Sequence, residues 1–208
     1  MRRMSRGALL ASSRCEQIAY FLLISVRAAY GERRVGSPRE MGERPDYDEF
    51  CRLPDLDEAL ASESDFEKAL RRVLQEARVI TGARYAALGV LDEERTELER
   101  FVALGVDADT ERAIGRLPRG RGVLGVLIAD PRPLRLADLA QHPGSYGFPA
   151  GHPPMRSFLG APILIGGEPV GNLYVADKYD GGAFTEADEY AVVGLASVAA
   201  RAIERERG

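Results

Sequence analysis

The sequence of 208 residues has no tryptophan, two cysteines and two histidines. Cys15 and Cys51 both precede the segment with regular hydrophobic patterns, which argues against a disulfide framework and favours a reducing cytoplasm. The same scarcity leaves no cysteine cluster for a metal ion. Two histidines alone, His142 and His152, do not make a His-rich metal site.

The net charge is small, and long hydrophobic runs are also rare. The net charge is -4, which gives no general electrostatic case for binding nucleic acid. The apolar run from Ile18 to Tyr30 is interrupted by Arg27 and is shorter than the roughly 20 residues that span a bilayer, so stable membrane insertion is not expected. Residues 1–45 are expected to be a disordered or misassigned extension; a membrane-touching helix and a targeting signal are the alternatives.

The remaining sequence has the patterns of one domain. Residues 46–63 are interpreted as a linker and the start of the N-terminal helix, and residues 64–208 as the domain. The stretch Ser64-Asp-Phe-Glu67 predicts a capping box with Ser64 as N-cap, and Gly82 predicts the end of the helix that follows. Thr185 predicts the start of the last helix.

Apolar segments between these helices predict strands. They cover residues 84–91, 98–104, 133–136, 158–165 and 170–176, with short helices at 109–115 and 122–129. This order predicts an α+β fold, in which a central antiparallel sheet carries the N- and C-terminal helices on one face. The proline- and glycine-rich loop 137–156 is then expected to build a ligand pocket on the other face.

Motifs for catalysis and nucleotide binding are weak. The stretch from Gly120 to Gly125 matches G-x-G-x-x-G, but Pro118 argues against the preceding strand that a dinucleotide site needs. A tight turn that opens a short helix explains the glycines better. No nucleophile elbow surrounds Ser145 or Ser157, and the domain has no cysteine nucleophile, so the protein is not expected to be an enzyme.

One histidine stands on an unusually stiff stretch of chain. His152 precedes two prolines, which fix their own backbone and restrict the residue before them. A neutral imidazole held in this way suits axial ligation of a haem iron. An apolar wall for such a group is expected from Phe148, Met155, Phe158 and Leu159. The alternative is a loop histidine that donates a hydrogen bond to a backbone carbonyl.

Four longer motifs resemble a known family: GRGVLGVLIADPRPLRLADL, HPGSYGFPAGHPPMRSFLGAPI, VGNLYVADK and FTEADE. Between about Phe66 and Arg205 the chain resembles GAF domains and, more narrowly, the sensor GAF domains of mycobacterial dormancy-regulon histidine kinases. The resemblance implies a GAF fold with a b-type haem that senses oxygen, nitric oxide, carbon monoxide or redox state. It places the proximal iron ligand at His152, directly before Pro-Pro-Met, and a distal tyrosine at Tyr174.

The resemblance predicts a stand-alone, cytoplasmic sensory domain. Because no kinase segment follows, signalling is expected through a homodimer on the terminal helices or through a separate protein such as a histidine kinase. One alternative is a GAF module that binds another small molecule or serves only as a scaffold for protein contacts. Reduction of free methionine sulfoxide is another, and it is disfavoured because Cys15 and Cys51 precede the domain.

Overall fold

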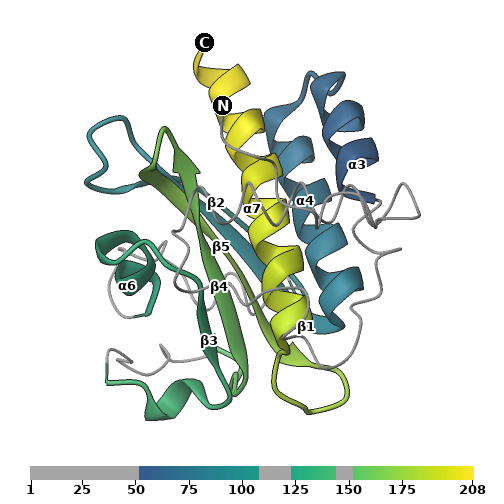
Figure 1. The fold of residues 1–208 in the computed structure, drawn as a ribbon, viewed down its shortest axis with the longest axis vertical. Helices are drawn as coiled ribbons and strands as arrows, with labels where there is room; N and C mark the ends of the chain where they lie inside the picture. Colours follow the sequence, from purple (N-terminus) through teal and green to yellow (C-terminus); the bar gives the residue numbers. More distant parts are fainter. Residues whose placement is uncertain (1–51, 108–122, 144–151) are drawn as a thin grey trace, which may run out of the picture.

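The computed structural model describes residues 52–107, 123–143 and 152–208, which form one antiparallel sheet with helices on both sides (Figure 1). The strands lie in the order β2-β1-β5-β4-β3, and every neighbouring pair is antiparallel. Their bounds are β1 Ala83–Leu91, β2 Leu98–Leu104, β3 Leu134–Leu136, β4 Phe158–Ile165 and β5 Glu168–Lys178. The predicted central antiparallel sheet is confirmed.

Three helices cover one face of this sheet (Figure 1). They are α3 Arg52–Ala61, α4 Phe66–Thr81 and α7 Glu186–Arg207. Helix α7 packs on β4 and against α4, while α3 packs on α7. The opposite face carries the short helix α6, Val123–Ala129, and the 3-10 helix η2, Leu139–Gln141. The prediction of terminal helices on one face of the sheet is therefore confirmed.

Strand β5 extends beyond the predicted residues 170–176 because both of its ends find partners. Its first residue, Glu168, pairs with Ile165 of β4, and its last, Lys178, pairs with Ala83 of β1. Only Gly166 and Gly167 remain in the turn between β4 and β5, with φ angles of 62° and 86°. Two consecutive left-handed residues give a hairpin turn whose twist matches that of the strands.

Helix α4 begins one residue later than the sequence pattern suggested. Its N-cap is Asp65, whose carboxylate accepts a hydrogen bond from the backbone amide of Lys68 at 3.1 Å. The predicted N-cap Ser64 is therefore wrong, because the stronger acceptor one residue later takes the role. Glu67 forms an ion pair along the helix instead of completing a capping box. Gly82 ends the helix in the left-handed conformation, as predicted.

Helix α7 starts with the predicted cap. Thr185 accepts a hydrogen bond from the Asp188 amide, and the Asp188 carboxylate accepts one from the Thr185 amide, which completes a capping box. Most side chains between Tyr190 and Ile203 are buried, because α7 packs on β4 and β5, α4 packs beside it on the same sheet, and α3 packs against it. More residues of α7 are therefore buried than the single inner face that helical spacing predicted.

Helix α3 lies within residues 46–63, which were interpreted as a linker and the start of the N-terminal helix, and it is a helix separate from α4. Leu53, Leu56 and Leu60 are buried at helical spacing. A side chain at Gly194 of α7 would lie 2.7 Å from a methyl carbon of Leu53, so this glycine lets α3 and α7 approach closely. The segments 1–45 and 109–115, for which the sequence also gave expectations, lie outside the described residues.

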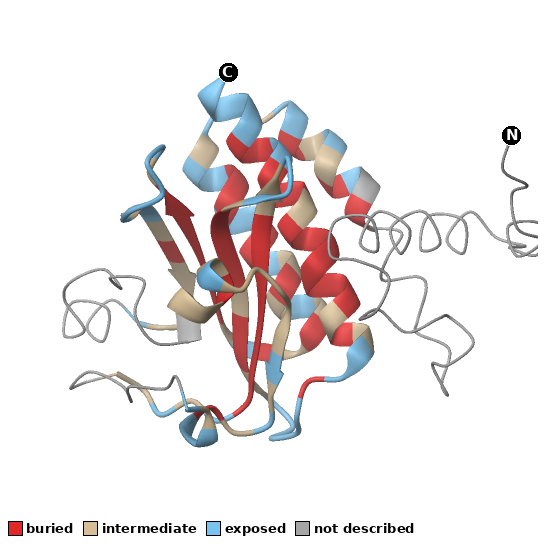
Figure 2. Cartoon of the chain, turned by 60° about the vertical axis from the view of Figure 1, so that its left-hand side comes forward, coloured by how far each residue is buried: buried red, intermediate tan, exposed pale blue. Residues whose placement is uncertain are grey.

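The core lies between the sheet and the helices. Figure 2 shows the buried residues running through the central strands and along α4 and α7. Alternate residues such as Leu88, Leu159 and Leu173 point to this side and are fully buried. Among the described residues, no helix is long and apolar enough to cross a membrane.

Candidate functional site

The face of the sheet that α6 covers, here called the α6 face, carries two of the aromatic residues predicted to contact a ligand. Tyr174 of β5 and Phe158 of β4 stack with ring centroids 5.6 Å apart and an interplanar angle of 29°. Leu127 of α6 and Leu139 of η2 belong to the same apolar cluster. The structure therefore brings Tyr174 and Phe158 together, against segments that lead into the long loop.

Small residues flank Tyr174 on both sides. In the strand register it lies between Ala87 of β1 and Gly160 of β4. A side chain at Gly160 would lie 2.6 Å from a methyl carbon of Leu127, so the glycine allows α6 to approach the sheet. The aromatic side chain of Tyr174 thus stands above a floor of small residues.

Asn172 of β5 is a polar residue of the α6 face for which the sequence motif VGNLYVADK predicted no role. It is 2% exposed, and its side-chain oxygen would lie 3.3 Å from a Cβ atom at Gly89 of the neighbouring strand. An amide offers both a donor and an acceptor, so Asn172, on the same face of β5 as Tyr174, is suited to contact a polar group of a ligand.

The phenol of Tyr174 is held in its neutral form. Burial raises the pKa of Tyr174 above its usual value of about 10, because the phenolate would lose hydration. The group therefore stays protonated at physiological pH. A neutral phenol both donates and accepts a hydrogen bond, which suits contact with a small polar ligand.

His152 is half-buried at the start of the described segment that leads into β4. Its ring atom Nδ1 lies 2.7 Å from the carbonyl oxygen of Pro153. Because a carbonyl only accepts, this bond assigns a proton to Nδ1, which makes Nε2 the ring nitrogen of metal-ligand type. The geometry agrees with the expected loop histidine bonded to backbone, and it is also the state in which an imidazole binds a metal.

The remaining predicted wall residues are not brought together. Met155 is half-buried on the same segment as His152. Leu159 is fully buried in the core on the helix side, because neighbouring residues of a strand point to opposite faces. Leu159 and Phe158 therefore lie on opposite faces of the sheet, and the prediction that both form one apolar wall for a ligand is wrong for Leu159. Phe148 lies outside the described residues.

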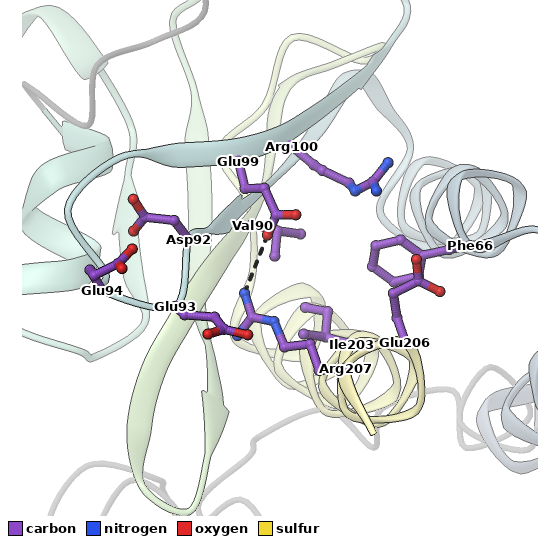
Figure 3. A pocket seen from close by; sticks show the side chains of 10 residues that line it. All are labelled: Phe66, Val90, Asp92, Glu93, Glu94, Glu99, Arg100, Ile203, Glu206 and Arg207. Atoms are coloured by element: carbon purple, nitrogen blue, oxygen red, sulfur yellow. Dashed lines mark ion pairs between the residues drawn. The ribbon is translucent and has the colours of Figure 1, made fainter.

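A cavity of about 500 Å³ lies away from these residues, between the β1–β2 hairpin and the last turn of α7 (Figure 3). Its rim is strongly charged, and Arg207 of α7 reaches Glu99 at 3.7 Å and donates to the carbonyl oxygen of Leu91. The lining residues are Phe66, Val90, Asp92, Glu93, Glu94, Glu99, Arg100, Ile203, Glu206 and Arg207. Such an open, charged rim is typical of a solvated surface hollow.

The sequence also raised the questions of a metal cluster and of a glycine-rich nucleotide motif. No group of three or more His, Cys, Asp or Glu residues in the described part of the chain is arranged to hold a metal ion. Of the glycine motif, residues 123–125 open helix α6, as the interpretation of a turn before a short helix requires, while residues 120–122 lie outside the described ranges.

Comparison with known proteins identifies the fold. A family model described as "GAF domain" matches residues 63–204. The GAF domain of a phosphoenolpyruvate-protein phosphotransferase from Coxiella burnetii is similar in structure, with 25% identity and a TM-score of 0.66. That alignment covers 76% of this chain and 94% of the Coxiella chain.

Two further solved structures share the fold at lower identity. A free methionine-R-sulfoxide reductase from Neisseria meningitidis, solved with its substrate, is 23% identical with a TM-score of 0.59, covering 74% of this chain and 87% of that one. The GAF domain of an Acinetobacter phosphoenolpyruvate-protein phosphotransferase is 19% identical with a TM-score of 0.63, covering 74% and 92%.

Proposed function

The chain belongs to the GAF family of small-molecule sensory and regulatory domains, and from this premise we propose that it senses a gas or redox state through haem b bound by His152. The observation that carries the proposal is the hydrogen bond from His152 Nδ1 to the Pro153 carbonyl oxygen, 2.7 Å long. It orients the ring and assigns a proton to Nδ1, as in metal-bound histidines whose other nitrogen donates to backbone.

The donor chemistry of the chain fits this cofactor better than a bare metal ion. A haem iron would need only one protein ligand, because the macrocycle would supply its remaining donors. Since the described residues offer no cluster of three metal-binding side chains, a single histidine is the relevant donor. Bound haem supplies an iron that takes up oxygen, nitric oxide or carbon monoxide, or changes its oxidation state.

The α6 face supplies the surroundings. Phe158 and Leu127 give apolar contact, and Tyr174 and Asn172 give two polar groups on one strand. The neutral phenol of Tyr174 donates a hydrogen bond to a polar or gaseous ligand. We further propose that Met155, which lies on the His152 segment, contributes to the apolar surroundings.

A visible absorption spectrum tests the proposal. The full chain is expressed with haem supplied, beside His152→Ala and the matched control His142→Ala, which removes the other half-buried loop histidine. We expect a Soret band in the wild type and in His142→Ala, and its loss in His152→Ala. A colourless wild-type protein contradicts the proposal, as does a Soret band of equal intensity in His152→Ala.

A second candidate function is the binding of a different small molecule, and Asn172 is the observation that favours it. Its amide is 2% exposed, on the α6 face, and offers both a donor and an acceptor. A ligand with an amide or carboxylate group would satisfy it. Calorimetry of haem-free protein against amino acids and nucleobases separates this candidate from the first one, which predicts no such binding.

Enzymatic function is not part of the proposal. The reductase from Neisseria meningitidis shares the fold with this chain. Both cysteines of this chain precede the segment that the family model matches, so this segment itself supplies no thiol for such chemistry. We propose instead that the protein signals to a second copy or to a separate protein such as a histidine kinase.

The helix layer limits where such a partner binds. Helix α7 is enclosed, so a pairing surface on the helices has to use the outer sides of α3 and α4. Val79 of α4 is 66% exposed, the largest exposed fraction given for a large apolar side chain in the described ranges.

A further inference from the structure

Asp177, the second-last residue of β5, has a backbone conformation that few side chains adopt. Its φ angle is 51°, in the left-handed region, and among the described residues Arg95 is the other non-glycine residue with a positive φ. This conformation costs free energy because Cβ approaches the following carbonyl oxygen. Such outliers persist where surrounding contacts fix them, and they concentrate at functional sites.

The carboxylate of Asp177 binds the backbone that leads from His152 into β4. Its Oδ1 atom accepts hydrogen bonds from the amides of Arg156 at 2.6 Å and Ser157 at 3.3 Å. The amide of Asp177 in turn donates to the Ser157 carbonyl oxygen at 2.9 Å. Bonds from backbone amides to a carboxylate are stronger than neutral ones, so Asp177 clamps two consecutive residues.

Arg156 is also held from the other side. Its carbonyl oxygen accepts a hydrogen bond from the amide of Leu139 at 2.7 Å. Leu139 begins η2, in the first arm of the loop 137–156, and Arg156 ends the second arm. The clamp therefore fixes both arms of the loop at one residue, four positions after His152.

The residue after Asp177 connects the same point to the helix layer. Lys178 Nζ lies 2.8 Å from Asp188 Oδ2, and the two side chains are 16% and 9% exposed. Asp188 completes the capping box of α7 by accepting from the Thr185 amide at 2.6 Å. Two successive residues of β5 thus have different partners: Asp177 binds the end of the loop 137–156, and Lys178 binds the first turn of α7.

We propose that Asp177 is the positioning residue of the His152 segment and that Asp177 and Lys178 together join this segment to the first turn of α7. The strained backbone at Asp177 is kept because it aims the carboxylate at Arg156 and Ser157 while Lys178 reaches Asp188. The importance of this joint for sensing rests on the proposed function, but the joint itself exists without any ligand.

Tryptic cleavage of the full, ligand-free chain after Arg156, an exposed residue, tests the clamp. Asp177→Gly relieves the backbone and removes the carboxylate, and Asp177→Asn keeps an acceptor. Asp180→Gly is the matched control, since its carboxylate binds the Gly182 amide at 2.8 Å within the exposed turn. We expect cleavage after Arg156 to accelerate about tenfold or more in Asp177→Gly, about threefold in Asp177→Asn, and not in Asp180→Gly. Equal rates in Asp177→Gly and Asp180→Gly overturn the clamp.

Amide hydrogen exchange tests the joint in the same proteins. We expect exchange in the first turn of α7, residues 186–190, to accelerate at least about threefold in Asp177→Gly and to stay unchanged in Asp180→Gly. If the Arg156 and Ser157 amides exchange faster but α7 does not, the connection to α7 is wrong. If Asp177→Gly fails to fold, Asp177→Asn replaces it in this test. We expect exchange in the same residues to accelerate in Asp177→Asn, by a smaller factor than in Asp177→Gly.

The expected results of tryptic cleavage and amide exchange do not depend on haem binding. A titration of the wild type with hemin is read separately by its Soret band. Absence of that band contradicts the proposed function while the cleavage and exchange results stand. Conversely, a normal Soret band with equal cleavage of Asp177→Gly and Asp180→Gly contradicts the clamp and leaves the proposed function intact.

Discussion

Removal of the Asp188 side chain is expected to destabilise the domain far more than removal of its cationic partner. In Asp188→Ala the Lys178 ammonium, 16% exposed, loses the carboxylate 2.8 Å away, and the capping box of α7 is lost with it. Removing one partner of a fully buried ion pair costs about 3–5 kcal/mol of stability, because the other charge stays buried without a partner. The cost is lower here because both side chains keep some exposure to solvent. Together with about 1 kcal/mol for the cap, we expect about 3 kcal/mol in the free energy of unfolding.

In Lys178→Met the Asp188 carboxylate keeps the amide and hydroxyl of Thr185, at 2.6 and 2.9 Å. The thioether side chain stays beside the Phe184 ring, over which Lys178 now lies at 5.7 Å. Replacing one charge by an apolar side chain of similar length, with the other charge still hydrogen-bonded, is expected to cost about 1 kcal/mol or less.

Urea denaturation followed by far-UV circular dichroism measures both values. For a domain of this size each kcal/mol corresponds to roughly 2–4 °C in Tm, so Asp188→Ala is expected to melt about 6–12 °C lower. Equal losses for Asp188→Ala and Lys178→Met, or a loss below about 1 kcal/mol for Asp188→Ala, refute the reasoning, because the asymmetry follows directly from which charge remains unpaired.

Three other variants probe the sheet and the α6 face. Gly171→Ala places Cβ against the carbonyl oxygen of Gly89, which cannot move aside, so we expect a loss of about 2–3 kcal/mol in urea, with Gly182→Ala near neutral; similar losses contradict this. The wild type is expected to lose stability relative to Tyr174→Phe as pH rises above about 10, because the unfolded chain then ionises its tyrosine whereas burial raises the pKa of Tyr174 in the folded protein; a difference independent of pH contradicts it. Asn172→Leu is expected to leave thermal stability unchanged or higher and to weaken ligand binding about tenfold, whereas a large loss of stability would mean that the amide has a structural partner.

The sheet was predictable because its signals are local. The segments 98–104 and 158–165 are bounded by turn residues, and the structure begins and ends β2 and β4 at the same positions. Gly82 and Thr185 were equally readable, since left-handed glycines and threonine caps act within one turn of the chain.

The misses share a different cause. Ser64 and Asp65 both suit an N-cap, and only the actual path of the chain decides between them. Helix α3 is short and contains a proline, so its three buried leucines become informative only when α7 lies beside them. Tertiary packing supplies that information, which local propensity lacks.

The candidate site was predictable only in part. Tyr174 and Phe158 meet because the register of β4 and β5 fixes their faces, and the same alternation sends Leu159 to the core. The hydrogen bonds of Asp177 to residues 20 and 21 positions earlier are long-range contacts in a left-handed conformation. No periodic pattern marks such a residue, so its role could not be predicted from the sequence.

Rescue by imidazole tests the central claim most directly. In His152→Gly the space of the side chain is open to a free imidazole, which can replace it as an iron ligand. The account predicts that hemin gives a Soret band with the wild type, a weak band with His152→Gly, and recovery of that band when imidazole is added. A wild-type protein that binds no hemin, or a His152→Gly variant that binds hemin as the wild type does, contradicts it.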